Sequence, residues 1–396
     1  MAVETQMALL RIGIFYPIIT GWTAGTRHIR ILVHSLSRVC KLPSTEVCIL
    51  REQSDAPDRI DLPASVVPVP HPVSFPGEWR IRRLFSLPEQ RSLLMRTAQR
   101  HGVSVLLPLR GGPPRARNIK TIGWIPDFQH VQRPEFFSEQ ERQWRNNTFQ
   151  NIAERCSLVL LSSQNAVDHF SDLFPAYVHK ARLSPFPSLF AFEPPAGDPL
   201  ITVNKFNLPM KFALVANQFW RHKNHGLVIE ALRELHCKGI RIPVVMTGLP
   251  ADYRDRNNET MSRILQAIAS AGLNSDVRVL GMIGDSDLGS LMRAAAVVIQ
   301  PSLFEGWNLA LQDARALARP IICSDIPVHR EQVPEALGFF RPDRPDELAE
   351  LLARNWVDFD CSFKRDEETR ALTKEQEFAR VHGLRLLDIC NEALRQ

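Results

Sequence analysis

The chain has 396 residues, of which 44% are hydrophobic and 23% charged, a balance typical of a globular protein long enough for two domains. No stretch approaches the roughly 20 consecutive apolar residues of a membrane-spanning helix, and the first residues lack the basic start and small-residue cleavage site of a secretory signal. Seven scattered cysteines form no Cys-x-x-Cys pair and no His/Cys cluster. We therefore expect a cytoplasmic protein with buried free thiols, without disulfides or a zinc site.

Strands and helices alternate along the first half of the chain. An apolar run over 9–16 predicts the first strand, and a glycine-containing loop leads from it into a helix over 27–39. Further strands are expected at 47–50, 66–69, 103–107, 120–125 and 158–162, and further helices at 88–100 and 138–155. This alternation is typical of a doubly wound parallel sheet.

A proline-rich segment over 183–199 interrupts this pattern and indicates a linker. The alternation then restarts, with strands expected at 212–216, 243–247, 277–281, 296–300 and 320–323, and a last helix over 374–395. We predict an α/β protein in four parts: a Rossmann-like domain over 1–185, a linker over 186–200, a second Rossmann-like domain over 201–373, and a C-terminal helix over 374–396. Ligands of such sheets bind beyond the carboxyl ends of the strands.

The segment from Gln300 to Val333 carries the strongest chemical signal. Glu305 and Asp313 stand eight positions apart, and a Gly-Trp-Asn turn between them leads into a helix expected to start near Trp307. A helix N-terminus favours an anion, and ionised carboxylates accept strong hydrogen bonds from hydroxyl groups. The pattern suits a nucleotide sugar, although an ordinary βαβ unit with capping acids has the same spacing.

This segment resembles the E-x7-E donor motif of the retaining GT-B glycosyltransferases of family 4, the bacterial polysaccharide and O-antigen type. The residues that match the motif are Pro301, Ser302, Glu305, Gly306, Leu309, Ala314, Pro320, Ile321, Ser324 and Asp325. Asp313 stands for the second glutamate, and Trp307-Asn308 for Phe-Gly. The resemblance implies a GT-B fold, in which two doubly wound domains face each other across a cleft and the C-terminal helix crosses back to the first domain. It also implies that Glu305 positions the donor sugar and that Asp313 holds the ribose.

A second polar loop follows the first strand of the second domain and includes Asn217, Gln218, Arg221 and Lys223. In the resembling family an arginine and a lysine of this loop contact the donor diphosphate. Lys223 stands at the lysine position and Gln218 at the arginine position, with Arg221 as a neighbouring cation. A cation here stabilises the departing diphosphate, so no metal or other cofactor is expected. Thr247, Gly248 and the pair Ile283-Gly284 are expected to line the nucleotide pocket.

The first domain offers two further candidates. Gly25 belongs to a loop that in the family reaches the diphosphate or the acceptor. Asp127 and His130 follow a strand at a place where related enzymes carry a His-Asp pair, but Pro126 replaces that histidine. Asp127 or His130 is a candidate general base for the acceptor hydroxyl, and a purely structural pair is an equal alternative.

A basic segment runs from Arg80 to Lys120, with ten basic residues and one acid in a chain of net charge +5. Three interpretations stay open: contact with an anionic membrane surface, a pocket for an acceptor phosphate, or a solvated face. The first would place the protein on the inner face of the membrane. Nucleic-acid binding is not expected, because the segment contains no recognised module.

The favoured function is retaining transfer of a sugar from a nucleotide sugar to a glycan, lipid-linked or protein acceptor, in the synthesis of O-antigen, capsule or a related glycoconjugate. Because several resembling enzymes use GDP-mannose or related GDP-sugars, such a donor is favoured. In the family the leaving phosphate helps to take the acceptor proton during attack on the same face. The alternatives are a sugar-nucleotide binding protein without transferase activity and a sugar-nucleotide epimerase.

Overall fold

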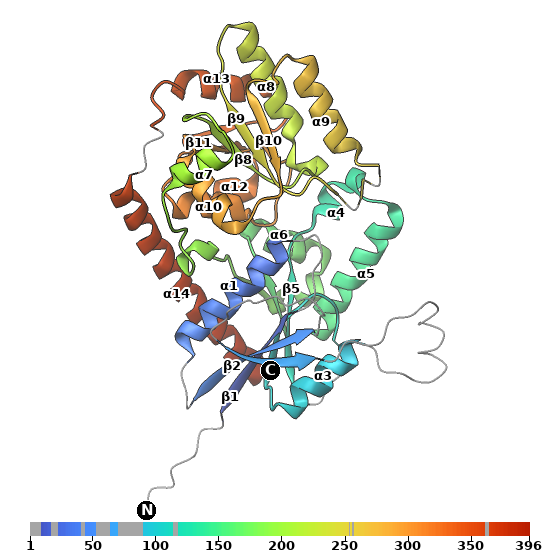
Figure 1. The fold of residues 1–396 in the computed structure, drawn as a ribbon. Coiled ribbons are helices and arrows are strands. Elements are labelled where there is room, and N and C mark those ends of the chain that lie inside the picture. Colours follow the sequence, from blue (N-terminus) through green and yellow to red (C-terminus); the bar gives the residue numbers. More distant parts are fainter. Residues whose placement is uncertain are drawn as a thin grey trace, which may run out of the picture. The chain divides into compact units, whose positions relative to one another are not determined.

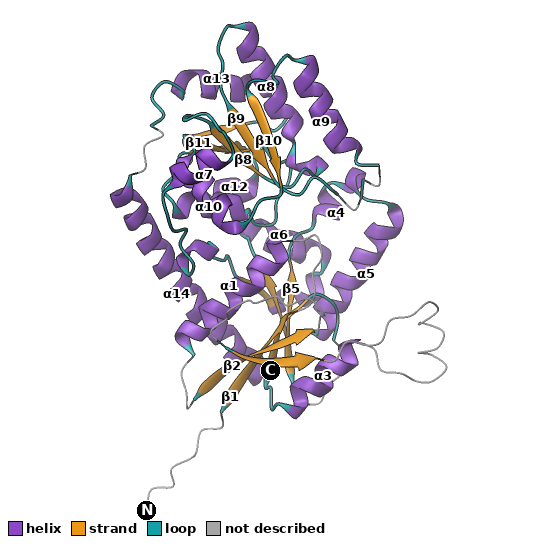
Figure 2. Cartoon of the chain, in the orientation of Figure 1, coloured by secondary structure: helices purple, strands orange, loops and turns teal. Residues whose placement is uncertain are grey.

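The computed structural model describes residues 9–16, 23–40, 44–52, 64–69, 90–113, 118–252, 254–255, 257–360 and 364–396. The chain forms two compact units, one made of 1–128, 143–186 and 378–396, the other of 129–142 and 187–377. Helices and strands alternate in both (Figure 2). Both units therefore show the alternation of strands and helices that the sequence predicted.

The first unit is built on a parallel sheet of seven strands in the order β3-β2-β1-β4-β5-β6-β7 (Figure 1). Its strands are β1 Leu10–Tyr16, β2 Thr45–Glu52, β3 Ser65–Val69, β4 Val105–Leu109, β5 Lys120–Ile125, β6 Leu158–Leu161 and β7 Ala181–Leu183. Its main helices are α1 Thr23–Val39, α3 Gln90–Arg100, α5 Glu139–Arg155 and α6 Gln164–Leu173, with a 3-10 turn η2 Pro175–Lys180.

Helices cover both faces of this sheet. Apolar residues of α1, such as Ile29 and Leu32, pack with β1 and β5 on one face. Residues of α3, α5 and α6 pack on the other. Its central strands β4 and β6 are buried along their whole length and are uniformly apolar.

The second unit is built on a parallel sheet of six strands in the order β10-β9-β8-β11-β12-β13. Its strands are β8 Ala213–Ala216, β9 Val244–Thr247, β10 Val277–Gly281, β11 Val297–Gln300, β12 Ile321–Ser324 and β13 Gly338–Phe340. Its helices are α4 Gln129–Gln132, α7 Pro199–Lys205, α8 His225–Cys237, α9 Glu259–Ser270, α10 Asp285–Ala294, α11 Leu309–Ala316, α12 Pro327–Gln332, α13 Pro345–Asn355 and the first part of α14 Arg365–Arg395. The 3-10 turns are η1 Pro134–Phe136, η3 Leu189–Ala191 and η4 Arg221–Lys223.

The strand order of the second unit indicates where a ligand is expected to bind. Helices α8, α9 and α13 pack on one face of the sheet, and α7, α10 and α11 on the other. The order runs outward from β8 in one direction and from β11 in the other, so the two neighbouring strands form the topological switch point. Ligands of doubly wound sheets bind in the crevice outside the carboxyl ends of such strands.

Several expected boundaries differ from the structure. The helix expected near Trp307 begins at Leu309, because Asn308 caps it: the Asn308 side chain accepts from the backbone of Leu311. Gly25 lies inside the first turn of α1 rather than in a loop. Cys237 is exposed, against the expectation of buried thiols. The expected linker over 186–200 contains η3 and the start of α7, and the segment 129–142 belongs to the second unit.

The last helix is longer than the sequence pattern indicated. Helix α14 begins at Arg365, and its residues from 378 onward belong to the first unit, where Leu386, Ile389 and Cys390 join the apolar core. A Cβ built at Gly383 would lie 2.3 Å from the Ser35 carbonyl oxygen of α1. Glycine is required there because two helix backbones approach closely.

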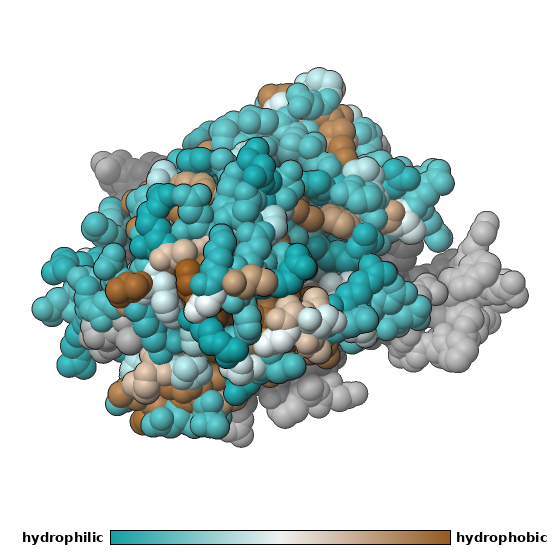
Figure 3. Space-filling view, turned by 90° about the horizontal axis from the view of Figure 1, so that it is seen from above, coloured by the Kyte–Doolittle hydropathy of each residue, from teal (hydrophilic) through white to brown (hydrophobic). Residues whose placement is uncertain are grey.

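Exposed apolar side chains are scattered. Figure 3 shows a face on which hydrophilic residues predominate and hydrophobic residues gather in small groups, as is usual for a protein surface. Among the described residues, no helix has the length and apolar character to cross a membrane. Most of the basic residues between Arg80 and Arg117 lie outside the described residues or have undescribed side chains, whereas Arg96, Arg100 and Arg110 are exposed.

The Gly383 contact gives a first prediction. Gly383→Ala should lower the melting temperature, because overpacking against backbone costs about 1–3 kcal/mol. Gly226→Ala, in α8 with nothing within 4 Å of the new Cβ, is the control and should be neutral or slightly stabilising. Circular dichroism melts of both variants measure the difference. Equal melting temperatures for the two variants would contradict the close approach of α14 and α1.

Candidate functional site

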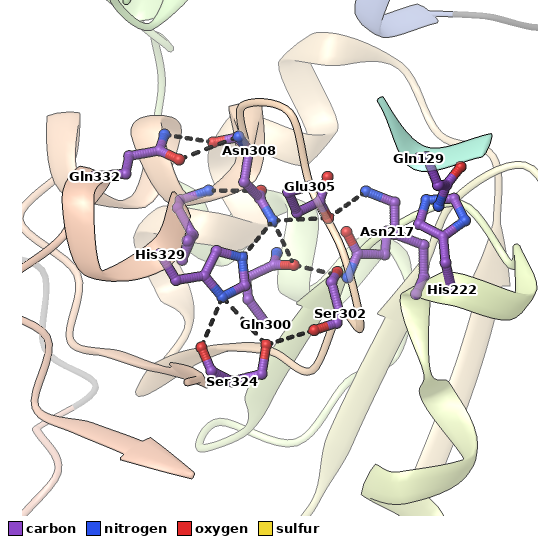
Figure 4. A network of polar contacts seen from close by, with 12 residues as sticks. Gln129, Asn217, His222, Gln300, Ser302, Glu305, Asn308, Ser324, His329 and Gln332 are labelled. Atoms are coloured by element: carbon purple, nitrogen blue, oxygen red, sulfur yellow. Dashed lines mark hydrogen bonds and ion pairs between the residues drawn. The ribbon is translucent and has the colours of Figure 1, made fainter. Parts of the chain in front are cut away.

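A network of buried polar side chains lies at the carboxyl ends of β8, β11 and β12 (Figure 4). It connects the loop after β8 with the segment between β11 and α11. All of its residues belong to the second unit. The network therefore occupies the switch point of that sheet, where the fold places a ligand.

An ion pair between Lys223 and Glu305 forms the centre of the network. The Lys223 Nζ atom lies 2.6 Å from Glu305 Oε1, and the two side chains are 14% and 8% exposed. Charges that are withdrawn from water to this extent need a partner, because their desolvation is costly. The pair brings together the two residues to which the sequence assigned the diphosphate and the donor sugar.

The loop that carries Lys223 is held by backbone and amide contacts. Asn224 adopts the left-handed conformation, with φ 57°, which asparagine tolerates better than most residues. Its Nδ2 donates to the carbonyls of Pro301 and Pro342 at 3.1 and 2.9 Å, and the backbone N–H of Leu303 donates to the His222 carbonyl at 2.8 Å. The loops after β8 and β11 are thus joined, and Lys223 is kept facing Glu305.

The amide side chains of Asn217 and Asn308 both contact Gln300 and so connect the loops at the switch point. Asn217, just after β8, donates through Nδ2 to Gln300 Oε1 at 2.7 Å, and Gln300 is the last residue of β11. Asn308 Nδ2 lies 3.1 Å from Glu305 Oε1 and 3.3 Å from Gln300 Oε1. Asn217, expected to line the donor site, is 6% exposed and contributes to its buried floor.

Residues after β12 complete the network. His329, of α12, is fully buried, and burial is the main cause that lowers its pKa to about 4. Its ring contacts Ser324 and Asn308. Gln332 holds the backbone of Asn308 from both sides: its Nε2 donates to the Asn308 carbonyl at 2.7 Å, and its Oε1 accepts from the Asn308 N–H at 3.1 Å.

Asp313 lies on the inner side of α11 and is fully buried. The Ser188 hydroxyl donates to Asp313 Oδ1 at 2.6 Å, and the Ser188 N–H donates to Glu375 at 2.7 Å. Gln312 also donates to Glu375, at 2.6 Å, and burial raises the pKa of Glu375. In this structure Asp313 therefore binds the chain near η3, and contact with a ribose would require its carboxylate to become exposed.

A second cluster holds the segment 129–142 against the loop that contains Lys223. Arg254 forms a two-point ion pair with Asp252 at 2.9 Å and donates to Gln129 Oε1 at 3.2 Å. Its guanidinium lies 5.1 and 5.2 Å from the ring centres of Phe137 and Trp220, within cation–π range.

The remaining predicted donor-site residues lie at several places around this network. Arg221 is exposed, and its guanidinium lies 5.0 Å from the ring centre of Phe136. Gln218 is half-buried. The Thr247 hydroxyl donates to the Gly281 carbonyl at 2.7 Å. A Cβ at Gly248 would lie 2.0 Å from the Asn217 carbonyl oxygen, so only glycine fits beside that loop.

The turn before α11 is the part of the network nearest to solvent. Gly306, Trp307 and Leu309 are half-buried, whereas Asn308 between them is 2% exposed. Ile283 and Gly284 precede α10, and space around Gly284 is open. Asp325, which the sequence also marked, is held by Arg330 in a two-point ion pair at 2.7 and 2.9 Å.

The candidates from the first half of the chain are divided between the units. Gly25, in α1, and the half-buried Asp127, after β5, belong to the first unit. His130, in α4, belongs to the second unit and is 2% exposed, with its ring edge-on to Phe137. Their roles as acceptor base or phosphate contact stay predictions.

The sequence did not indicate Gln300, His329, Gln332 or Asn224 as site residues. Their positions carry a partial signal, because Gln300 ends a buried strand and the others follow strands of the same sheet. Asn in a turn before a helix also suggests the left-handed conformation. Which amide meets which carboxylate depends on sheet register and is not visible in the sequence.

The geometry supports one kind of chemistry best. A lysine and a carboxylate face each other beyond a switch point, beside the N-terminus of α11. Among the described residues there is no group of three or more His, Cys, Asp or Glu side chains placed to hold a metal ion. A lysine that can turn to a phosphate and a carboxylate that can accept from hydroxyls fit an anionic, hydroxyl-rich ligand.

Comparison with known proteins agrees with this geometry. Residues 200–357 match the family model described as glycosyl transferases group 1. This match lies within the second unit and includes the loops that carry Lys223 and Glu305. The O-antigen chain mannosyltransferase B of Escherichia coli is 24% identical over 182 residues, which are 46% of this chain and 45% of that protein. The aligned segments cover less than half of the length of each of the curated relatives.

Solved structures show the same fold over nearly the whole chain. A glycosyltransferase from Rickettsia africae ESF-5 aligns with a TM-score of 0.67 and 15% identity, over 98% of this chain and 100% of that one. Anabaena Alr3699/HepE in complex with UDP-glucose aligns with a TM-score of 0.63 and 14% identity, over 97% and 98%. The chain has the GT-B fold that the sequence predicted, with two doubly wound domains.

The buried histidines predict how stability depends on pH. The unfolded chain binds a proton on histidine below about pH 6.5, but folded His329 and His382 do so only below pKa values of about 4 and about 3, which burial mainly causes. At a pH between the folded and the unfolded pKa values of these histidines, unfolding therefore takes up protons. The free energy of unfolding should fall as the pH falls, by up to about 1.4 kcal/mol per pH unit for each histidine.

This fall should appear as a lower melting temperature at pH 5 than at pH 7, measured by calorimetry in buffers of equal ionic strength. His329→Gln removes one of the titrating groups and should reduce the difference between the two pH values. An unchanged difference in that variant would contradict the neutral, buried state of His329.

Proposed function

We propose that the chain is a metal-independent, retaining glycosyltransferase that uses a nucleotide sugar as donor. The observation that carries this proposal is the Lys223–Glu305 pair at the switch point of a group 1 glycosyltransferase domain. Lys223 leaves Glu305 to contact the diphosphate and stabilises its charge as it departs. Glu305 then accepts hydrogen bonds from the sugar hydroxyls, and the leaving phosphate takes the acceptor proton.

The donor that we favour is GDP-mannose or a related GDP-sugar. The support is the similarity to an O-antigen mannosyltransferase over part of the chain; a structural neighbour instead holds UDP-glucose. The acceptor we propose is a growing glycan, a lipid-linked oligosaccharide or a protein, in O-antigen or capsule synthesis. We propose that the protein is cytoplasmic and acts at the inner face of the membrane, where the exposed Arg96 and Arg100 of α3 would contact anionic lipids. A sugar-nucleotide binder without transfer is the second candidate, favoured by Gln218 and Pro126 at positions where the family has Arg and His.

Nucleotide binding is the first property to test. One nucleoside diphosphate, GDP in our proposal, should raise the melting temperature in a panel with UDP, dTDP and CMP, because a ligand of the folded state stabilises it. Lys223→Ala should weaken that effect by an affinity loss of about tenfold or more, the cost of one hydrogen bond between charged groups. Lys205→Ala is the matched control, since Lys205 also pairs with a carboxylate, Asp287 at 2.7 Å, but is 55% exposed.

The control variant should bind the nucleotide as the wild type does. If no nucleotide in the panel stabilises the chain, both the transferase and the binder are excluded. An equal loss of nucleotide affinity in Lys223→Ala and Lys205→Ala would instead contradict a contact between Lys223 and the phosphates.

Catalysis is the second property to test. The wild type should slowly hydrolyse one nucleotide sugar in the presence of a chelator. Glu305→Gln keeps the shape of the side chain but loses its charge, and should slow this hydrolysis by about a hundredfold, the effect of misplacing a reacting group. Release of the nucleoside diphosphate measures the rate. Stabilisation by a nucleotide sugar without any hydrolysis or transfer would favour the binder, and full activity in Glu305→Gln would contradict the role of Glu305.

A further inference from the structure

A line of buried polar contacts runs from the end of β11 through α12 and back to Glu305 (Figure 4). Its members are Ser302, Ser324, His329 and Asn308, each no more than 2% exposed, and Glu305, which is 8% exposed. Buried polar groups need hydrogen-bond partners, and this requirement fixes which atom donates at each step.

The hydroxyl of Ser324 determines the protonation of the histidine ring. Ser324 Oγ donates its single hydrogen to the Ser302 carbonyl at 2.6 Å. His329 Nδ1 lies 2.9 Å from the Ser324 carbonyl and 3.2 Å from Ser324 Oγ. Both of these oxygens can only accept from the ring, so Nδ1 carries the hydrogen. Because the buried ring is neutral, Nε2 carries a lone pair.

The orientation of the Asn308 amide follows from this assignment. Asn308 Oδ1 accepts from the Leu311 N–H at 3.2 Å, so Nδ2 points the other way. It faces three acceptors there: Glu305 Oε1 at 3.1 Å, Gln300 Oε1 at 3.3 Å and His329 Nε2 at 3.4 Å. If His329 Nε2 carried a hydrogen, that hydrogen would point at the hydrogens of the Asn308 amide and repel them. The amide would then turn, lose the cap of α11 and direct its oxygen at the Glu305 carboxylate.

We propose that neutral His329 is a positioning residue for Glu305. Its Nε2 accepts from Asn308 and helps to fix the Asn308 amide with its hydrogens toward Glu305 Oε1, so that Asn308 keeps Oε1 occupied when Lys223 turns to the diphosphate. The second oxygen, Oε2, is left to face the donor sugar. This inference rests on the proposed function for the part that concerns the sugar.

Two other features support a positioning role. The motif that this segment resembles has glycine at position 308, so Asn308 adds an amide whose orientation needs a partner. Gln332 fixes the Asn308 backbone from both sides, so the orientation of the amide is set by what its side chain contacts. His329 is one of these contacts, together with the Leu311 N–H and Gln300.

A matched pair of variants separates positioning from packing. The amide of His329→Gln reaches the place of Nε2, where its oxygen can accept from Asn308. The amide of His329→Asn reaches only the place of Nδ1, where it can donate to the Ser324 carbonyl. His329→Asn should reduce kcat/KM for hydrolysis of the donor by about tenfold, the effect of one lost hydrogen bond near a charge, and His329→Gln should restore most of the activity.

The nucleoside diphosphate should stabilise both variants as it does the wild type, because the proposal concerns the sugar side of the site. His382→Gln replaces another fully buried histidine, in the first unit, and controls for a general loss of stability. Equal activity in the Gln and Asn variants of His329, or an equal loss of nucleotide binding and activity, would overturn the positioning role.

A second readout needs no donor. In the 15N-labelled wild type at pH 7, an imidazole that is absent from the spectrum of His329→Gln should show a protonated Nδ1 and an unprotonated Nε2. Protonation at Nε2, or at both nitrogens, would overturn the proposal. If this tautomer is found but no nucleotide sugar binds or reacts, the proposed function fails while the arrangement of Asn308 and His329 stands.

Discussion

The organisation of the second unit's site depends on one buried ion pair, Lys223 with Glu305. Two charges in this position are tolerable only as partners and with further hydrogen bonds. The surrounding structure supplies them: Asn224 holds the lysine loop, Asn308 donates to the carboxylate, and strands β8 and β11 bring the two loops together. In our proposal a diphosphate replaces the carboxylate as the partner of the lysine, and the carboxylate is then free for sugar hydroxyls. The pair is thus a ligand-free form of the binding site that we propose.

Much of the fold could be predicted from the sequence because the central strands are buried and form apolar runs. The strand Lys120–Ile125 agrees with the structure at both ends, and so does the edge strand Val277–Gly281. The short edge strands β7 and β13, with three residues each, lack such a run and were not expected. Helix α14 was placed too late because its first turns are rich in charged residues and show little apolar periodicity.

The site could be predicted only in part. Lys223 and Glu305 were found through a motif, and the structure places them in contact. Asp313 satisfied the same motif, but the fold turns it inward to Ser188, a contact across 125 positions that spacing cannot reveal. His329 belongs to no motif, and the role that we propose for it depends on its contacts with Ser324 and Asn308, which spacing does not reveal.

The most direct test of the account is a crystal structure with the nucleoside diphosphate that stabilises the chain most. Our account predicts the diphosphate beyond the ends of β8 and β11, within hydrogen-bond distance of Lys223 Nζ, with the Lys223–Glu305 contact broken and Asn308 still bonded to Glu305. A diphosphate bound elsewhere, or one bound there with the Lys223–Glu305 pair intact, would contradict it.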